Sequence, residues 1–340
     1  MTSTKRQRHI KSSMLKIFSR TKISSVTYPS NFLRATLPIR TMATGAANNE
    51  DLRVNKLFDV SNFSAVVTGG VSGIGLMITQ TLVANGAKVY ITGRREEALK
   101  TVVERYNTGP GKIIPLPGDI TKKNDILRLV KEVESKESKG IHLLVNNAGI
   151  ARDDNTKYSN GKPDFKSAQS LSDHLMKSDP QAWADTFSTN VTSQFFVAAA
   201  FLPLLSKSLN STPGFSPSIV NITSISGVMK GSSNGQFAYA SSKAAFLHLT
   251  RMMATTFLEA KVRVNSIAPG VFPSEMTAGK SDEHQKSELD SEASNPAGRY
   301  GHDTDMGACI LFLAGPGGVF LNGQVVYPDG GNILVSPACT

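Results

Sequence analysis

A doubly wound α/β fold, with helices on both faces of a parallel β-sheet, is the fold class that this 340-residue sequence predicts. From Phe58 onward, short apolar runs alternate with helix-length segments. The runs are continuous rather than alternately polar, which is typical of strands covered on both faces. A glycine-rich turn also joins the first run to the first helix-length segment, as in nucleotide-binding α/β domains. A chain of this length can bury the core of one such domain.

The order of the elements predicts one domain and no internal repeat. Parallel strands joined by helices require right-handed crossovers, which place the helices on both faces of the sheet. We expect seven strands, at Ala65–Thr68, Lys88–Thr92, Lys112–Leu116, His142–Asn146, Ser218–Ile222, Val262–Ile267 and Gln324–Tyr327. The expected helices cover residues 73–85, 95–107, 122–138, 181–208, 240–260 and 303–314. A polar stretch, 153–178, is expected to be a surface loop inserted before the helix expected over 181–208.

The first 49 residues read as an extension that precedes the domain at 50–340. They hold nine basic residues and no acidic one, so the remainder of the chain carries only about +1 of the net charge of +10. A nucleic-acid-binding domain is therefore disfavoured, because it would need a basic face of its own. Basic, Ser-rich and acid-free segments with scattered apolar residues are typical of mitochondrial transit peptides. A plain disordered extension, or a start at Met42 with a cytoplasmic protein, remains open.

Composition excludes several other classes. Apolar residues make up 40% and charged residues 19% of the chain, as in soluble globular proteins. Two cysteines, Cys309 and Cys339, are too few for a disulfide framework or a cysteine-built zinc site. No His, Asp, Glu and Cys cluster has metal-ligand spacing, so we expect no metal. The longest apolar run, Phe195–Leu205, is shorter than the ~18–20 residues of a membrane-spanning helix, so no transmembrane segment is expected.

The turn after the first expected strand reads T-G-G-V-S-G-I-G over residues 68–75. Glycines allow a tight turn and a close approach of the backbone to a pyrophosphate, which the following helix N-terminus attracts. The turn therefore predicts a dinucleotide site. Its candidate cofactor-binding residues are Thr68, Gly69, Ser72, Gly73, Ile74 and Gly75.

The spacing T-G-x-x-x-G-x-G resembles that of the short-chain dehydrogenase/reductase family, and further family motifs follow in order, all but one of them just after an expected strand. These are Gly118-Asp119-Ile120, Asn146-Asn147-Ala148-Gly149, Thr223-Ser224-Ile225-Ser226-Gly227, Tyr239-Ala240-Ser241-Ser242-Lys243 and Pro269-Gly270. The resemblance implies a single Rossmann-fold domain with strand order 3-2-1-4-5-6-7. It also implies adenine contacts at Asp119 and Ile120, and further cofactor contacts at Asn147, Ala148, Gly149, Tyr239, Lys243, Pro269 and Gly270.

Tyr239 and Lys243 are four residues apart, so they share one face of a helix. An ammonium near a phenol favours the phenolate, and we expect it to lower the tyrosine pKa from its ordinary value of about 10. Tyr239 would then serve as an acid or base near neutral pH. The resemblance adds that Lys243 binds the nicotinamide ribose.

Two further side chains complete the site that the resemblance implies. Ser224 would hold the substrate oxygen, and Asn190 would support a proton-relay water that reaches the lysine. The family spacing to the tyrosine would choose Ser226, but the glycine three residues after the serine chooses Ser224, with a two-residue insertion before Tyr239. We favour Ser224, because an insertion in a loop costs little.

The cofactor is expected to be NADP(H) in preference to NAD(H). Gly93 stands at the end of the second strand, where an NAD-type enzyme carries an acid for the ribose hydroxyls, and an acid would repel a 2′-phosphate. Arg94 follows and could bind that phosphate through charge-assisted hydrogen bonds. Ser72 occupies the place of a second basic residue in many NADP-using members, so we expect a preference and not exclusive use of NADP(H).

The predicted reaction is reversible hydride transfer between a nicotinamide and a carbonyl or alcohol carbon. The detail of residues 68–99 resembles 3-oxoacyl reductases and rhamnolipid-type β-ketoacyl reductases, which favours carbonyl reduction by analogy. An NAD(H)-dependent alcohol dehydrogenase, or a non-catalytic nucleotide-sensing scaffold on the same fold, remains open. The apolar faces of 191–205 and 244–258 exceed what one domain needs, so we also expect a homotetramer or homodimer.

Overall fold

The computed structural model describes residues 49–212 and 214–336, which belong to one compact unit that begins at Asn48. The predictions for residues 1–48, including the transit peptide and the alternative start at Met42, lie outside the described residues, as does Cys339.

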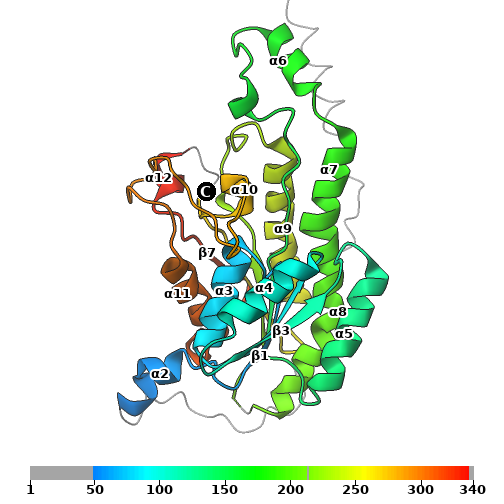
Figure 1. Ribbon diagram of the computed structural model, residues 1–340, viewed down its shortest axis with the longest axis vertical. Coiled ribbons are helices and arrows are strands. Elements are labelled where there is room, and N and C mark those ends of the chain that lie inside the picture. The colour runs from blue at the N-terminus through cyan, green and yellow to red at the C-terminus, as the bar shows by residue number, and fades with distance from the viewer. Residues whose placement is uncertain (1–48, 213, 337–340) are drawn as a thin grey trace, which may run out of the picture. The chain divides into compact units, whose positions relative to one another are not determined.

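Seven parallel strands form one sheet in the order β3-β2-β1-β4-β5-β6-β7, which confirms the predicted fold class and strand order (Figure 1). Continuous apolar runs form these strands because helices cover both faces of the sheet. The central strands β1, β4, β5 and β6 are buried at every residue. The strands are β1 (Ser64–Thr68), β2 (Lys88–Gly93), β3 (Lys112–Pro117), β4 (Leu143–Asn146), β5 (Ser218–Ile222), β6 (Arg263–Ile267) and β7 (Val325–Val326).

Three helices cover each face of the sheet. One layer contains α3 (Gly73–Ala84), α4 (Glu96–Tyr106) and α11 (Asp303–Ala314), whose buried side chains join one core cluster. The other layer contains α5 (Lys123–Lys136), α8 (Ser193–Lys207) and α9 (Phe237–Thr256), which join the second cluster. Figure 1 shows α3 and α11 on one side of the strands and α5, α8 and α9 on the other.

Short helical elements, which the sequence did not predict, occupy the connections. They are η1 (Asn49–Leu52), α2 (Val54–Leu57), η4 (Ser208–Asn210), η5 (Ile225–Gly227), α10 (Glu275–Ala278), η6 (Pro316–Gly318) and α12 (Asn332–Val335).

The single helix expected over 181–208 is interrupted by a π-helical turn. It consists of α7 (Pro180–Phe187), the π turn η3 (Ser188–Thr192) and α8. A π turn widens the helix by one residue and leaves a carbonyl without its usual partner. Here the Thr189 carbonyl oxygen instead accepts hydrogen bonds from the side chains of Ser193 and Gln194, at 2.6 and 2.9 Å. Helical residues Pro180–Asn210 are long and apolar enough to span a membrane by length and composition alone, but α8 buries Val197, Phe201 and Leu205 in the core, as ordinary core helices do.

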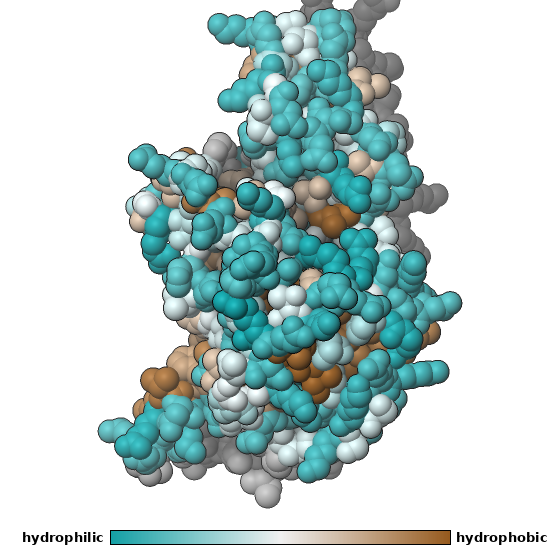
Figure 2. All heavy atoms as spheres, in the orientation of Figure 1, coloured by the Kyte–Doolittle hydropathy of each residue, from teal (hydrophilic) through white to brown (hydrophobic). Residues whose placement is uncertain are grey.

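The insertion at 153–178 is not the plain surface loop that its composition predicts. It contains η2 (Tyr158–Asn160) and α6 (Ala168–Leu175), and the Ser167 side chain caps α6 by accepting from the Ser170 backbone N–H at 3.2 Å. Its surface is mainly hydrophilic, as expected, around α6 at the top of the view (Figure 2). Buried His174 joins the two ends of the insertion, with Nε2 3.0 Å from the Thr156 carbonyl oxygen.

Candidate active site

A cleft of about 480 Å³ opens at the carboxyl edge of the sheet. It lies outside the ends of β1 and β4, where the strand order reverses direction, the usual place for a ligand in a doubly wound sheet. The cleft gathers segments that are far apart in the sequence. Among the predicted site residues that line it are Gly69, Ser72, Gly73, Ile74, Arg94, Asp119, Ile120, Asn147, Ala148, Gly149, Ser224, Tyr239, Lys243, Pro269 and Gly270.

The glycine turn after β1 takes the shape that a pyrophosphate requires. Gly69 has a φ of +64° and Gly73 one of +51°, which side chains other than glycine rarely adopt. A Cβ at Gly75 would lie 2.1 Å from the Gly69 carbonyl oxygen, so only glycine permits this packing of α3 against the turn. The side chain of Ser72 does not cap α3, and Ser72, Gly73 and Ile74 line the cleft, so the start of the helix favours an anion there.

Asn147 joins the segment after β4 to this turn. Its backbone N–H donates to Thr68 Oγ1 at 2.9 Å, and its side-chain amide donates to the carbonyl oxygens of Thr68 and Gly69 at 2.9 and 3.1 Å. The Ala148 N–H also donates to Thr68 Oγ1, at 3.1 Å. Thr68 thus acts as a structural part of the cradle, whereas Asn147 both holds the turn and lines the cleft.

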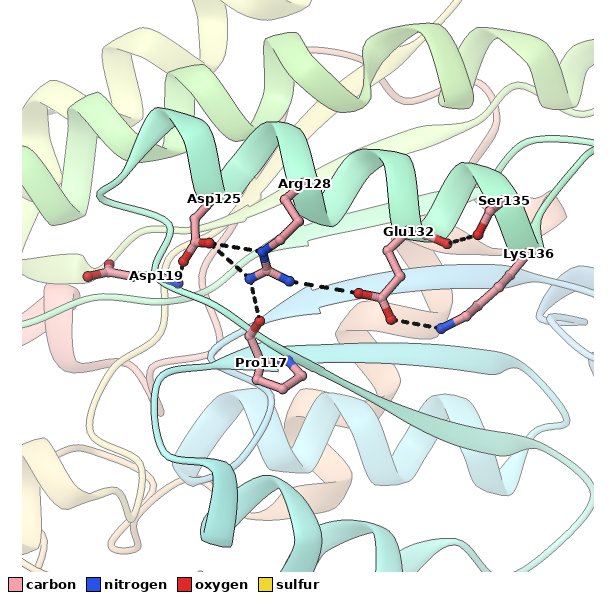
Figure 3. A network of polar contacts seen from close by, with 7 residues as sticks. All are labelled: Pro117, Asp119, Asp125, Arg128, Glu132, Ser135 and Lys136. Carbon is pink, nitrogen blue, oxygen red and sulfur yellow. Dashed lines mark hydrogen bonds and ion pairs between the residues drawn. The ribbon is translucent and has the colours of Figure 1, made fainter.

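The segment at Asp119 is held from α5, as Figure 3 shows. The Asp119 N–H donates to Asp125 Oδ2 at 2.8 Å, and Arg128 bonds both Asp125 Oδ1, at 3.0 Å, and the Pro117 carbonyl oxygen, at 2.7 Å. The hydrogen bond from Asp119, and then that from Arg128, lower the pKa of Asp125. The segment that follows β3, whose Asp119 and Ile120 line the cleft, is therefore held in place by α5.

Arg94 and Arg95 differ in their partners although both line the cleft. Arg95 forms a bidentate ion pair with Glu275, at 2.9 and 3.0 Å, which joins the β2–α4 connection to α10. Arg94 is exposed, and within residues 49–212 and 214–336 it has no ion-pair partner. Its guanidinium is thus available to a ligand beside Gly93.

Tyr239 and Lys243 lie in α9, and both face the cleft. Lys243 is only 4% exposed, and its Nζ donates to the Ile222 carbonyl oxygen at 2.9 Å and lies 5.7 Å from the centre of the Tyr239 ring. An ammonium has three hydrogens, so two remain for a ligand. Ser224, two residues after the end of β5, forms a side-chain hydrogen bond with Tyr239.

The predicted fall in the tyrosine pKa is wrong for this arrangement. Burial raises the pKa of Tyr239, and the hydrogen bond with Ser224 opposes this rise only in part. Burial also lowers the pKa of Lys243 to about 8. The physical reason is that burial penalises the charged form of both groups, and the lysine hydrogen-bonds a backbone oxygen rather than the phenol.

Asn190 lies within the π turn and is fully buried. Its side chain bonds both polar atoms of the Ile150 backbone, accepting from N–H and donating to the carbonyl oxygen at 2.8 Å each, and donates to Ser242 Oγ at 3.0 Å. A Cβ on Gly149 would lie 3.2 Å from Asn190 Oδ1 and 3.5 Å from Lys243 Nζ. Glycine at this position therefore keeps the space between the asparagine and the lysine open.

The structure gives the two candidate serines different surroundings. Ser224 lines the cleft, whereas Ser226 Oγ lies 2.6 Å from Ser233 Oγ in the loop that follows. The Ser226 N–H donates to Ser224 Oγ at 3.1 Å, so the two are neighbours with separate partners. This geometry favours Ser224, as the glycine spacing does.

Several cleft residues were missed by sequence reasoning. Arg152 and Ile150 follow the Asn-Asn-Ala-Gly motif, Thr223 precedes Ser224, and Thr189 lies in the π turn. Others come from the segment after Gly270, which the sequence marked only as a loop: Phe272, Ser274, Glu275, Met276 and Thr277. No cluster of His, Cys, Asp and Glu able to hold a metal ion occurs among the described residues.

The sheet, the glycine turn and the cleft together define a dinucleotide-binding enzyme of the doubly wound α/β class. The family model described as Enoyl-(Acyl carrier protein) reductase matches residues 69–332. The short-chain dehydrogenase/reductase PhomF′ of Diaporthe leptostromiformis is 43% identical over 284 residues, which cover 83% of this chain and 95% of that protein. The chain therefore belongs to the short-chain dehydrogenase/reductase family.

Other relatives narrow the class of enzyme. The chain is 34% identical over 277 residues to a rhamnolipids biosynthesis 3-oxoacyl-[acyl-carrier-protein] reductase of Pseudomonas aeruginosa, covering 81% of this chain and 97% of that protein. The structure of the RhlG/NADP active-site complex from the same organism matches with a TM-score of 0.66 at 32% identity, over 81% of this chain and 98% of that one. The protein is thus an NAD(P)-dependent oxidoreductase acting on a CH–OH/C=O pair, related to 3-oxoacyl-acyl carrier protein reductases.

Proposed function

We propose that this enzyme reduces a ketone, with a 3-oxoacyl compound as the favoured class, at the expense of NADP(H). The observation that carries the proposal is the placement of Tyr239, Ser224 and Lys243 in the same cleft as the glycine turn and Arg94. One cleft therefore contains both the residues proposed to bind the nucleotide phosphates and those proposed to carry the proton chemistry. The relationship to a 3-oxoacyl reductase supports the substrate class.

The residues present fit a dinucleotide. The positive φ at Gly69 and Gly73, the N-terminus of α3 and the open space beside Gly149 provide a cradle that side chains would fill. When bound, a nicotinamide supplies the hydride that a carbonyl carbon accepts. Gly69, Ser72, Gly73 and Ile74 would hold the pyrophosphate, Asp119 and Ile120 the adenine, and Ala148, Gly149, Pro269 and Gly270 the nicotinamide half.

In this mechanism, Ser224 and Tyr239 bind the substrate oxygen, and Tyr239 gives its phenolic proton to that oxygen as the carbon accepts the hydride. The raised pKa of Tyr239 keeps the phenol protonated and able to act as the acid. Lys243 would use its two remaining hydrogens to orient the nicotinamide ribose. The space bounded by Asn190 and Lys243 would hold the water that returns a proton to the site.

The preference for NADP(H) is proposed on the charges at the end of β2. Gly93 places no carboxylate there, and among the described residues Arg94 has no ion-pair partner, whereas Glu275 pairs with the neighbouring Arg95. A charge-assisted bond from Arg94 to a 2′-phosphate would contribute roughly 1.5–3 kcal/mol, or about 10–150-fold in preference.

The decisive experiment is steady-state oxidation of NADPH and NADH by the purified protein over a panel of 3-oxoacyl thioesters, simple ketones and the matching alcohols. We expect turnover with 3-oxoacyl thioesters and a higher kcat/KM with NADPH. Equal or better kcat/KM with NADH would overturn the cofactor preference. Tight nucleotide binding without turnover of any carbonyl or alcohol would instead indicate a scaffold or sensor.

We further propose that the protein forms a homotetramer or homodimer through α8 and α9. The two helices and the turn after α9 leave large apolar side chains accessible, with Phe195 at 43%, Met252 at 53% and Leu258 at 55% exposure. A second copy would bury them. Sedimentation equilibrium at micromolar concentration tests this, and a monomer alone would contradict it.

A further inference from the structure

Asp153, in the insertion, places a buried carboxylate against the first turn of the catalytic helix. Its side chain is 4% exposed. Oδ1 accepts the backbone N–H of Ala238 at 2.8 Å, and Oδ2 accepts that of Tyr239 itself at 3.0 Å. The two carboxylate oxygens therefore hydrogen-bond the backbone of Tyr239, the proposed proton donor, and of Ala238 before it.

The start of α9 depends on this carboxylate because its own sequence provides no cap. The first N–H groups of a helix lack partners within the helix, and a polar side chain just before it usually accepts one. At α9 that position is Gln236, whose side chain makes no such bond. Asp153, 85 and 86 positions earlier in the chain, accepts two of them instead. A carboxylate is also well placed there, since the helix N-terminus carries partial positive charge.

The chain segment just before Asp153 belongs to the cleft proposed to bind the cofactor. Asp153 follows the segment 147–150, in which Asn147 is tied to the glycine turn and Ile150 is bonded through both backbone atoms to Asn190. Only two residues separate Ile150 from Asp153. The position of the Tyr239 backbone is thereby set from the same short segment that lines the nicotinamide end of the cleft.

Hydrogen bonds from the rest of the insertion fix the position of Asp153. The Asp153 carbonyl oxygen accepts the N–H groups of Thr156 and Lys157 at 3.0 Å each. Thr156 Oγ1 donates to the Gly235 carbonyl oxygen at 2.8 Å, and the Tyr158 N–H donates to that of Asn234 at 3.0 Å. The turn before Tyr239 and the start of the insertion are thus fastened together, with the Asp153 carboxylate between them.

We propose that Asp153 is a positioning residue for the reaction: it sets the distance between the phenol of Tyr239 and the cofactor segment by holding the first turn of α9. The inference rests on the proposed function of Tyr239. Displacing a reacting group by about 1 Å can lower a rate by about 100-fold, so a capping bond at this place influences catalysis as well as folding.

The test is Asp153→Asn, which keeps the shape of the side chain but presents an NH₂ group to one of the two N–H donors. The matched control is Asp154→Asn, because Asp154 is exposed and, among the described residues, its carboxylate bonds only Lys157, at 3.0 Å. Binding of NADPH, followed by its fluorescence, counts the folded sites. Turnover per site, the solvent deuterium isotope effect and amide exchange at Ala238 and Tyr239 are then measured.

We expect Asp153→Asn to lower kcat per site by about 10–100-fold, with the dissociation constant of NADPH within about twofold of the unmodified protein. The solvent isotope effect should rise, because proton transfer from a displaced phenol becomes slower, and exchange at the start of α9 should accelerate. Asp154→Asn should change none of these. If Asp153→Asn does not fold, Asp153→Ser, which retains one acceptor, should show the same pattern.

Unchanged kcat per site with faster exchange would overturn the proposal and leave Asp153 as a helix cap only. Equal losses of NADPH binding and turnover, with no change in the isotope effect, would overturn it as well. Failure of the unmodified protein to turn over any carbonyl compound would refute the proposed function instead. Amide exchange would then still decide whether Asp153 holds the residues at the start of α9, with unaltered exchange counting against it.

Discussion

A serine, a lysine and a tyrosine lie together at each edge of the sheet, but their hydrogen-bond partners differ. At the amino edge, Ser64, Lys88 and Tyr90 all donate to the buried carboxylate of Glu137, at 2.8, 2.8 and 2.6 Å. At the carboxyl edge, Ser224, Lys243 and Tyr239 line the cleft, and none of their side chains hydrogen-bonds a carboxylate among the described residues. We call the first set the Glu137 cluster.

The difference shows in the ionisation of each set. Burial alone would raise the pKa of Glu137, but the hydrogen bonds from Lys88, Tyr90 and Ser64 outweigh it, and the net effect is a lowered pKa. In the cleft, burial dominates and lowers the pKa of Lys243 to about 8. Buried polar groups that satisfy one another stabilise a fold, whereas buried polar groups that face a cleft are costly unless a ligand completes them. We therefore assign the proposed proton chemistry to the set in the cleft and a stabilising role to the Glu137 cluster.

The largest expected effect comes from a matched pair of substitutions, Tyr239→Phe and Tyr90→Phe. Loss of the Tyr239 hydroxyl removes the proton donor, so turnover should fall by about 10²–10⁴-fold while NADPH binding and thermal stability persist. Loss of the Tyr90 hydroxyl should leave turnover per folded molecule unchanged and lower the free energy of unfolding by about 1–2 kcal/mol. Steady-state kinetics and urea unfolding of both variants measure this. More than about a tenth of the activity left in Tyr239→Phe would refute the assignment of the acid.

A second prediction concerns the charge at the end of β2. Gly93→Asp should reduce the ratio of kcat/KM for NADPH over NADH by about 10–150-fold, because the carboxylate would repel the 2′-phosphate. The position can accept a side chain, since a Cβ there would meet only Val71, at 3.7 Å. Gly93→Ala is the control for shape, and an equal change in that variant would show that charge is not the cause.

The third prediction tests the Glu137 cluster by pH. Glu137→Gln should lower the free energy of unfolding at pH 7 by about 1–3 kcal/mol, since it removes the charge that accepts three hydrogen bonds. The folded-state pKa is lowered from 4.5, so the carboxylate contributes fully above about pH 4.5, and its contribution is lost as the pH falls through the folded value. The difference between variant and unmodified protein should therefore shrink in acid. A difference that is constant from pH 7 to pH 3 would contradict the role of charge.

The smallest effect is expected from the N-terminal segment, because both polar sets begin after residue 63. Deleting residues 1–41 should change neither kcat/KM nor the unfolding midpoint. We propose that residues 1–49 act as a mitochondrial targeting segment, and fusion of these residues to a fluorescent reporter tests it by microscopy. A cytosolic reporter would favour a start at Met42.

The sequence by itself determined the fold class and, through the family resemblance, the strand order. It also identified those cleft-lining residues that come just after a strand. These follow from local rules: apolar runs make buried strands, and glycines make the turn at residues 68–75. The spacing of Tyr239 and Lys243 placed them on one helix face for the same reason.

Only the tertiary structure decided how these groups are ionised and positioned. The direction of the Tyr239 pKa depends on burial and on the partner that Lys243 actually takes, the Ile222 oxygen, which spacing along a helix does not reveal. The sequence pattern did not reveal the π turn at Asn190 or the helix within 153–178, nor the side-chain bonds at these elements, from Ser193 to the Thr189 oxygen and from His174 to the Thr156 oxygen. Asp153 lies 86 positions before Tyr239, and its role as a cap exists because chain segments remote in sequence meet at one edge of the sheet.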